Sequence, residues 1–215
     1  PPANFLRRTL PHFRDANLGL VQARWGHLNR NANLLTRAQA VLLDAHQLVE
    51  HAWRQGAGRF LNFNGTAGVW RRTCIDSAGG WSHETLTEDL DLSYRAQLAG
   101  WRFMFDPTLV VPAELPESMR AFRSQQHRWA KGALQTARKV LPRLARAPLP
   151  WHIKQEAFVH LTANVTYPLL LALEALLVPV LFAARTRPTA WVLALNIAVL
   201  AIGTLPVAMF LARGQ

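Results

Sequence analysis

The chain has 215 residues, which is enough for one domain core and a membrane-associated segment. Its 24 Lys and Arg residues against 13 Asp and Glu residues give a formal net charge of +11, a balance that suits nucleic acid, acidic lipid or a phosphorylated substrate. A single cysteine, Cys74, excludes an internal disulfide and a cysteine-based metal site.

The N-terminal part is expected to contain a short helix and then a strand. Asn4 to Leu10 predicts an amphipathic helix closed by Pro11, and Leu18 to Trp25 predicts the strand. The sequence opens with Pro1-Pro2 and no initiator Met, so we expect it to be part of a longer protein.

A long helix is expected from Asn33 to about Gln55. Its apolar stripe would consist of Leu34, Leu35, Ala38, Val41, Leu42, Ala45, Leu48 and Val49. The same helix carries four polar residues, Asp44, His46, Glu50 and His51. Their spacing differs from the one-turn histidine pair of zinc helices, so we predict a solvated polar face and no metal site.

Small residues interrupt the strand that is expected from Phe60 to Trp70. Gly65 and Gly68 permit another group to approach the backbone closely, as a sugar chain lying on the protein would need. A β-bulge without a ligand explains the two glycines equally well.

The next helix is expected to begin near Thr85. Thr85 and Glu88 have the spacing of a capping box, and Leu86, Leu90 and Tyr94 recur on one helical face. Three acids, Glu88, Asp89 and Asp91, would then lie near the mouth of a cleft. The alternative is that acids in a first helical turn only complement the helix dipole.

Gly100 is expected to end this helix, and Trp101 to Phe105 predicts a strand that turns at Asp106-Pro107. Leu109 to Pro116 is broken by prolines and predicts a strand and a loop. A helix should follow from about Ser118 to Val140, and a second amphipathic piece should be broken at Pro142 and again by Pro148 and Pro150.

Positive charge gathers on that last helix and on the segment after it. Between Ser118 and Gln155 there are nine basic residues, Arg120, Arg123, Arg128, Lys131, Arg138, Lys139, Arg143, Arg146 and Lys154, and no Asp or Glu. Because the run directly precedes hydrophobic segments, it predicts interfacial helices that face lipid headgroups, and we expect no nucleic-acid partner.

Two membrane spans are expected at the C-terminal end. Residues 157–184 are mostly apolar, residues 190–212 carry no charge, and each stretch is long enough to cross a bilayer. Only Arg185 and Arg187 lie between them, so the positive-inside rule places the preceding domain in the cytoplasm.

Two short motifs, taken with these membrane segments, carry a family resemblance. Thr87-Glu88-Asp89 followed by Gln125-x-x-Arg128-Trp129 resembles the signature of processive family 2 glycosyltransferases, the cellulose synthase-like group that includes glucomannan synthases. Asn64-Gly65-Thr66 resembles the Phe-x-Gly-Ser/Thr element that lies near the acceptor sugar in that family. The resemblance runs from about Pro1 to Gln215 and covers only part of such an enzyme.

The resemblance implies an α/β fold of the glycosyltransferase A type, with a partial Rossmann-like mixed sheet. Residues 1–117 would be the C-terminal half of the catalytic domain, residues 118–156 the basic interfacial helices with the second motif, and residues 157–215 the two transmembrane helices. The protein would be a multi-pass protein of the cell inner (plasma) membrane.

The implied reaction moves a hexose from a nucleotide diphosphate sugar to a polysaccharide or lipid acceptor with inversion. Asp89 would be the catalytic base, positioned by Thr87 and Glu88. The substrate-binding residues would be Gln125, Arg128, Trp129, Asn64, Gly65 and Thr66. Of these, Arg128 suits a diphosphate and Trp129 suits a sugar face.

The implied donor belongs to the UDP-glucose or GDP-mannose class. In the family Mg²⁺ or Mn²⁺ bridges the diphosphate to an Asp-x-Asp pair, but no such pair precedes the strand expected at Leu18 to Trp25, so we expect no metal site in this chain. The alternative is a membrane-anchored remnant or binding partner that lacks the donor site.

Overall fold

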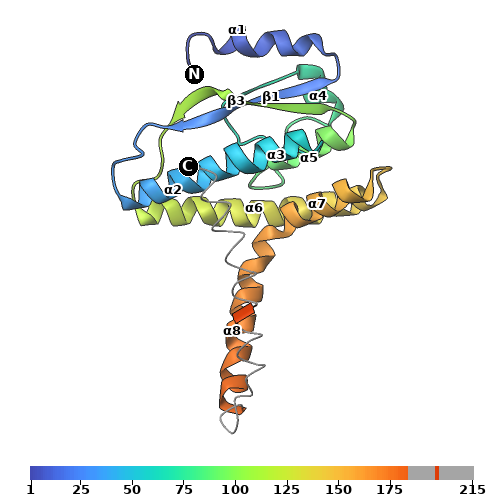
Figure 1. Ribbon diagram of the computed structural model, residues 1–215. Coiled ribbons are helices and arrows are strands. Elements are labelled where there is room, and N and C mark those ends of the chain that lie inside the picture. The colour runs from blue at the N-terminus through green and yellow to red at the C-terminus, as the bar shows by residue number, and fades with distance from the viewer. Residues whose placement is uncertain (184–196, 199–215) are drawn as a thin grey trace.

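The computed structural model describes residues 1–183 and 197–198 (Figure 1). In chain order its elements are α1 (Phe5–Thr9), the 3₁₀-helix η1 (Leu10–Arg14), β1 (Leu18–His27), α2 (Leu34–Ala45), the π-helix η2 (His46–His51), α3 (Ala52–Gly56), β2 (Gly68–Trp70), α4 (Arg72–Ser77), α5 (Glu88–Leu98), β3 (Arg102–Ala113), α6 (Met119–Arg146), α7 (Trp151–Thr162), the 3₁₀-helix η3 (Ala163–Val165) and α8 (Thr166–Ala183). The sheet lies between α1 and a layer that contains α2, α3 and α5, with α6 and α7 beneath that layer (Figure 1).

The sheet has three strands in the order β2-β1-β3. The central strand β1 runs antiparallel to β2 and parallel to β3. Ala23 aligns with Asp106 and Arg24 with Val110, so β3 bulges between these partners. The expected turn at Asp106-Pro107 is therefore this bulge inside one strand, where the missing N–H of Pro107 breaks no ladder.

The long helix expected from Asn33 to Gln55 is present as α2, η2 and α3, but its buried face was predicted wrongly. Leu34 is 76% exposed and Leu42 is 49% exposed. The buried side chains are instead largely polar: Thr36, Gln39, Asp44, Gln47, His51 and Arg54. The predicted solvated polar face is wrong, because Asp44 and His51 are buried and His46 and Glu50 pair with each other at 2.7 Å.

Asp44 shows how this polar interior is stabilised. Its carboxylate is 3.0 Å from Nη2 of Arg24 and 2.8 Å from Nη1 of Arg30. In the same way, Arg54 forms ion pairs with Glu50 at 2.9 Å and with Glu156 at 2.7 Å. Buried charges with such partners are tolerated, whereas unpaired ones are not.

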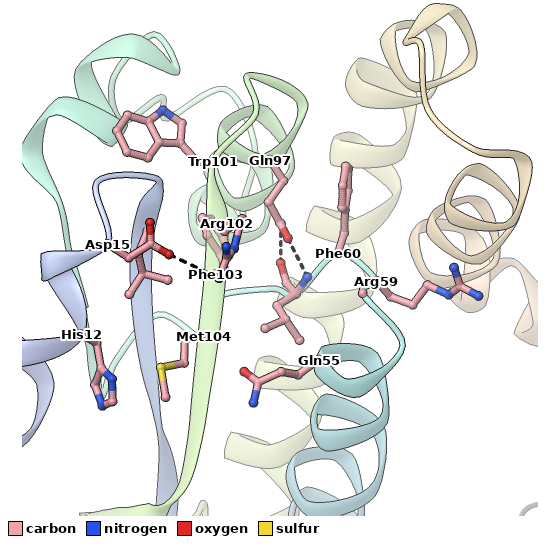
Figure 2. Close-up of a pocket in the computed structure, with 13 residues that line it drawn as sticks. His12, Asp15, Gln55, Arg59, Phe60, Gln97, Trp101, Arg102, Phe103 and Met104 are labelled. Atoms are coloured by element: carbon pink, nitrogen blue, oxygen red, sulfur yellow. Dashed lines mark hydrogen bonds and ion pairs between the residues drawn. The ribbon is translucent and has the colours of Figure 1, made fainter.

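Only Gly68–Trp70 of the strand expected from Phe60 to Trp70 pairs with the sheet. The segment before it is held by side chains of α5. Gln97 Oε1 accepts from Leu61 N at 2.8 Å, Gln97 Nε2 donates to Leu61 O at 2.7 Å, and Ser93 Oγ accepts from Phe63 N at 2.8 Å. Figure 2 shows the Gln97 bonds.

Helix α5 lies close to its predicted position, since Gly100 follows it with a φ of 94°. Its predicted start is wrong in detail. Thr87, not Thr85, is the N-cap, and no side chain caps the helix, so the capping box is absent. Leu86 is 46% exposed, whereas Tyr94 is fully buried.

Helix α6 continues through Pro142 for 28 residues, so the predicted break there is wrong. The second expected break, at Pro148 and Pro150, is confirmed, since α6 ends at Arg146 and α7 begins after Pro150. Tyr94, Val140 and Leu144 belong to one buried cluster with Ala157 and Leu161 of α7, so residues on both sides of position 117 share a core.

The first expected span, residues 157–184, is not one helix. Its first part belongs to α7, whose Ala157 and Leu161 are fully buried, and η3 separates that part from α8. Helix α8 projects away from the other elements (Figure 1). Among residues 1–183 and 197–198, no helix is both long and apolar enough to cross a membrane. All but two residues of the second expected span lie outside the described residues.

Helices α5 and α6 meet at Gly132, which is buried. A Cβ atom at this position would lie 2.5 Å from Thr87 Cγ2 and 2.8 Å from the backbone nitrogen of Thr87. Real Cβ atoms essentially never approach so closely, so only glycine allows α6 to cross the start of α5 at this separation.

We predict that Gly132→Ala lowers the free energy of unfolding by about 1–3 kcal/mol, because the methyl group overpacks the crossing. Gly56→Ala is the matched control, since it also lies in a helix and nothing is within 4 Å of its added Cβ. Helix propensity makes the control neutral or stabilising by up to about 1 kcal/mol. Urea unfolding of both variants measures the contrast, and equal effects would contradict the tight crossing.

Candidate active site

The nine site residues predicted from the sequence all line one cavity of about 360 Å³. They are Thr87, Glu88 and Asp89 at the start of α5, Gln125, Arg128 and Trp129 on α6, and Asn64, Gly65 and Thr66 in the loop before β2. Trp25 and His27, at the C-terminal end of β1, line the same cavity. Three separate stretches of the chain thus meet at one site.

Asp89 is a partly buried carboxylate in this cavity. Burial raises the pKa of Asp89 to about 6, although the hydrogen bond that Leu90 N donates to Oδ1 at 2.8 Å opposes the shift. No ion pair to Asp89 occurs among the described residues. At neutral pH this group is a carboxylate with an unusually high affinity for a proton.

Gly65 lies against this carboxylate. A Cβ atom at Gly65 would be 3.1 Å from Asp89 Oδ2, and the φ of Gly65 is 78°. Any other residue would be strained there and would crowd the acid. The predicted close approach to the backbone is therefore present, and the group that approaches is Asp89.

The other two residues of the first motif differ in exposure. Glu88 is exposed at the rim, whereas Thr87 is buried beneath Gly132 with its Oγ1 3.3 Å from Thr136 Oγ1. Thr87 is thus part of the contact between the two helices, which holds the first turn of α5 in place.

Asp91 was expected near the mouth of the cleft, and this expectation is wrong. Asp91 is fully buried, with Oδ2 2.9 Å from Arg95 Nε and 3.1 Å from Lys139 Nζ. Lys139 also forms an ion pair with Glu84 at 2.6 Å. Asp91 therefore binds α5 to α6 and does not share the cavity of Asp89.

Asp89-Leu90-Asp91 has the Asp-x-Asp spacing of a metal-binding pair, but its two carboxylates lie in different surroundings. In the part of the chain that the structure describes, no group of three or more His, Cys, Asp or Glu side chains could hold a metal ion. The residues present do not fit the divalent cation that the family resemblance implies.

The second motif contributes a cation and an aromatic ring. Arg128 is exposed, and its hydrogen bond to Ser124 Oγ is long at 3.4 Å, so the guanidinium is free to bind an anion. Trp129 is half-buried and lines two cavities, the one described above and a neighbouring one. A cation beside an indole suits a phosphate joined to a sugar.

The neighbouring cavity also has a volume of about 360 Å³ and shares Trp25, Asn64, Asp89 and Trp129 with the first. It extends to residues that the sequence did not single out as site residues, chiefly Gln47, Asn62 and Asn164. Trp25 could have been found, because the C-terminal end of a parallel strand commonly borders a binding crevice.

Gln22 of β1 fixes the loop that carries Asn64, Gly65 and Thr66. Its Oε1 accepts from Asn64 N at 3.2 Å, and its Nε2 donates to Thr66 O at 3.1 Å. Because Gln22 is 1% exposed and sits on the central strand, it ties the loop to the sheet.

A larger cavity of about 590 Å³ lies beside β3 (Figure 2). Asp15 and Arg102 form an ion pair there at 3.3 Å, and Trp101 and Met104 line it. None of the nine predicted site residues lines this cavity. This cavity is therefore separate from the two cavities that share Asp89.

We predict that Asp91→Asn lowers the free energy of unfolding by roughly 3 kcal/mol, because it removes the anion of a buried ion pair. Asp89→Asn should leave stability at pH 7.5 unchanged or raise it. The raised pKa means that folded Asp89 binds its proton more tightly than unfolded Asp89, so wild-type stability falls as the pH rises from about 4 to about 6.

The amide that replaces the carboxylate in Asp89→Asn does not titrate, so this part of the pH dependence should be absent from that variant. Denaturant unfolding of both variants at pH 4, 6 and 7.5 tests the assignment. A larger stability loss for Asp89→Asn than for Asp91→Asn would reverse the two roles.

Comparisons with known proteins identify the family of this chain. The profile described as Glycosyl transferase family group 2 matches residues 1–211. Glucomannan 4-beta-mannosyltransferase 2 of Arabidopsis thaliana is 46% identical over 147 residues, which is 68% of this chain and 28% of that protein. Glucomannan 4-beta-mannosyltransferase 1 of Oryza sativa subsp. japonica is 44% identical over the same shares.

A solved structure agrees on the fold. Mannosyltransferase PcManGT from Pyrobaculum calidifontis, in complex with GDP-Man and Mn²⁺, superposes with a TM-score of 0.56 at 19% identity. The match covers 100% of this chain and 57% of that one. This chain spans about a quarter of the length of the curated relatives it matches. The profile match over nearly the whole sequence shows that the chain belongs to glycosyl transferase family group 2.

Proposed function

We propose that this chain is the acceptor-binding and catalytic-base part of an inverting transferase that moves mannose from GDP-mannose to a growing β-linked polysaccharide. The observation that carries the proposal is the single cavity in which Asp89, Arg128 and Trp129 meet. The two curated mannosyltransferases and the mannosyltransferase that holds GDP-Man support mannose over glucose.

The reaction is a single displacement. An acceptor hydroxyl oxygen attacks the anomeric carbon, a new carbon–oxygen bond forms, and the bond to the diphosphate breaks on the opposite face. Asp89 takes the hydroxyl proton, and its pKa of about 6 leaves it ionised at neutral pH. GDP departs with the electron pair of the broken bond.

Arg128 and Gln125 stabilise the departing diphosphate, since both line the cavity and Arg128 is a charged hydrogen-bond donor. Trp129 stacks on a sugar ring. Thr87 holds the start of α5 against α6, Glu88 stands beside Asp89 at the rim, and Asn64, Gly65 and Thr66 form the opposite wall. Because the described residues do not fit a divalent cation, no step of this mechanism uses one.

We place the protein at the inner (plasma) membrane with Asp89 on the cytoplasmic side. Exposed apolar side chains on α8 support this placement, namely Leu169, Leu170, Leu171, Leu173 and Leu176. Seven of the nine basic residues between Ser118 and Gln155 would face acidic headgroups, since Arg128 lines the cavity and Lys139 pairs with Asp91 and Glu84. A lipid-linked acceptor would fit the same location as well as a polysaccharide.

We predict that Asp89→Asn lowers mannosyl transfer at least roughly a hundredfold, because an amide cannot accept the proton. The assay measures transfer from radiolabelled GDP-mannose to β-1,4-linked manno-oligosaccharides in membranes that contain the protein. Asp76→Asn is the matched control, since Asp76 is an exposed acid on α4 and lies outside both cavities. Near wild-type turnover in Asp89→Asn would refute the base assignment.

The same assay over pH gives a second test. Transfer by the wild-type protein should fall about tenfold per unit of pH below about 6, as Asp89 becomes protonated. If the wild-type protein transfers nothing from GDP-mannose or UDP-glucose, the reading as a remnant without a donor site becomes the better one.

A further inference from the structure

Gln47 differs from the other glutamines that hold the backbone around the sheet. Gln97 uses both ends of its amide on Leu61, and Gln55 uses both ends on Phe105, with 2.5 Å from Phe105 N to Oε1 and 3.1 Å from Nε2 to Phe105 O. Gln47 accepts one bond, from Trp25 N at 2.8 Å. Its Nε2 is buried and has no hydrogen-bond partner among the described residues.

This free amide group belongs to a fully buried side chain that lines the second cavity. The bond from Trp25 N identifies the amide oxygen, so the group left over is the donor –NH₂. An unsatisfied buried donor is costly, and such groups in native proteins need an explanation. A ligand in the cavity supplies one.

Other atoms around this cavity also lack partners. Asn62 Nδ2 donates to Asn64 Oδ1 at 2.8 Å, which leaves Asn62 Oδ1 and Asn64 Nδ2 without partners among the described residues. The indole nitrogen of Trp25 is also buried and has no hydrogen-bond partner among the described residues. These unpartnered buried groups are neutral donors and one acceptor, Trp129 adds an aromatic face, and Asp89 contributes the one carboxylate that the two cavities share. Neutral amides with aromatic rings suit a hydroxyl-rich, uncharged ligand.

The backbone at Gln47 supports a binding role. Gln47 lies in η2, where the helix between α2 and α3 widens into π geometry. Short π-helical stretches inside α-helices are rare and frequently occur at functional sites. The widening falls on the turn that carries Gln47 into the cavity wall.

We propose that Gln47 is a specificity-determining residue that donates hydrogen bonds to an acceptor sugar in the second cavity. This inference rests on the proposed function. The sugar unit would sit between Trp129 and the wall formed by Gln47, Asn62 and Asn64, with Asp89 at the boundary shared with the first cavity.

The test is binding of β-1,4-linked mannotetraose to the full chain, followed by tryptophan fluorescence, since Trp25 and Trp129 line the cavity. Gln47→Met keeps the shape of the side chain and removes its hydrogen bonds. We expect the affinity to fall roughly three- to tenfold, the effect of one or two lost hydrogen bonds. In the transfer assay the KM for the tetraose should rise while the KM for GDP-mannose stays constant.

Gln55→Met is the matched control, because it is the same substitution about two helical turns after Gln47. It removes two hydrogen bonds to the backbone of Phe105, outside the second cavity. It should lower the melting temperature and leave tetraose affinity unchanged. Gln47→Asn provides a milder variant if Gln47→Met does not fold, since it keeps the amide but withdraws it by about 1.5 Å. It should also weaken binding.

Unchanged affinity in a folded Gln47 variant, an equal loss in Gln55→Met, or no tetraose binding by the wild-type chain would each overturn the assignment of Gln47. The proposed function fails separately. Tetraose binding that depends on Gln47, without transfer from GDP-mannose, would refute the donor and leave the sugar site in place.

Discussion

The close crossing of α5 and α6 is the contact on which the candidate site depends. On α6, Gly132, Thr136 and Lys139 touch α5 at successive turns, and their partners on α5 are Thr87 and Asp91. On α6 the contacts are spaced by four residues and then by three, and the two partners on α5 are four residues apart. Residues at these spacings lie on one face of a helix. Continued toward the N-terminus, the same face of α6 carries Trp129 and Gln125. The contact that joins the helices therefore also delivers the second motif to Asp89.

The loop opposite the helices obeys a different constraint. From Phe60 to Asn64 the backbone pairs with no strand of the sheet, yet Phe60, Leu61 and Phe63 are buried and their polar backbone groups need partners. Gln97, Ser93 and Gln22 provide them from α5 and β1. Side-chain bonds of this kind hold an extended segment without a sheet, so Asn64 and Gly65 can face the cavity instead of a strand.

Sequence alone could name the residues of the candidate site because its motifs are short and local, and the structure gathers all nine residues in one cavity. Sequence could also predict that Asp89 and Asp91, two residues apart on a helix, face different sides, since each residue turns a helix by about 100°. It could not say which side is open. The side of Asp91 is closed because Lys139 pairs with it, and Lys139 lies 48 residues after Asp91 in the chain. The buried face of the helix from Asn33 to Gln55 was missed for the same reason. Hydrophobic periodicity cannot detect a face that is buried through distant ion pairs, such as those of Asp44 and Arg54.

The buried acids of this fold differ in their surroundings, and the difference fits the role that we propose for Asp89. Asp44 and Asp91 are almost fully buried, and each carboxylate has at least two cationic partners. Asp89 is partly buried and forms no ion pair with the described residues, although the chain has almost twice as many basic as acidic residues. A cation beside Asp89 would stabilise its charged form and lower its pKa, which would weaken it as a proton acceptor. Gly65 and Leu90 lie against Asp89 instead, so burial without an ion-paired cation keeps its pKa near 6, a value that suits the proposed role as a base at neutral pH.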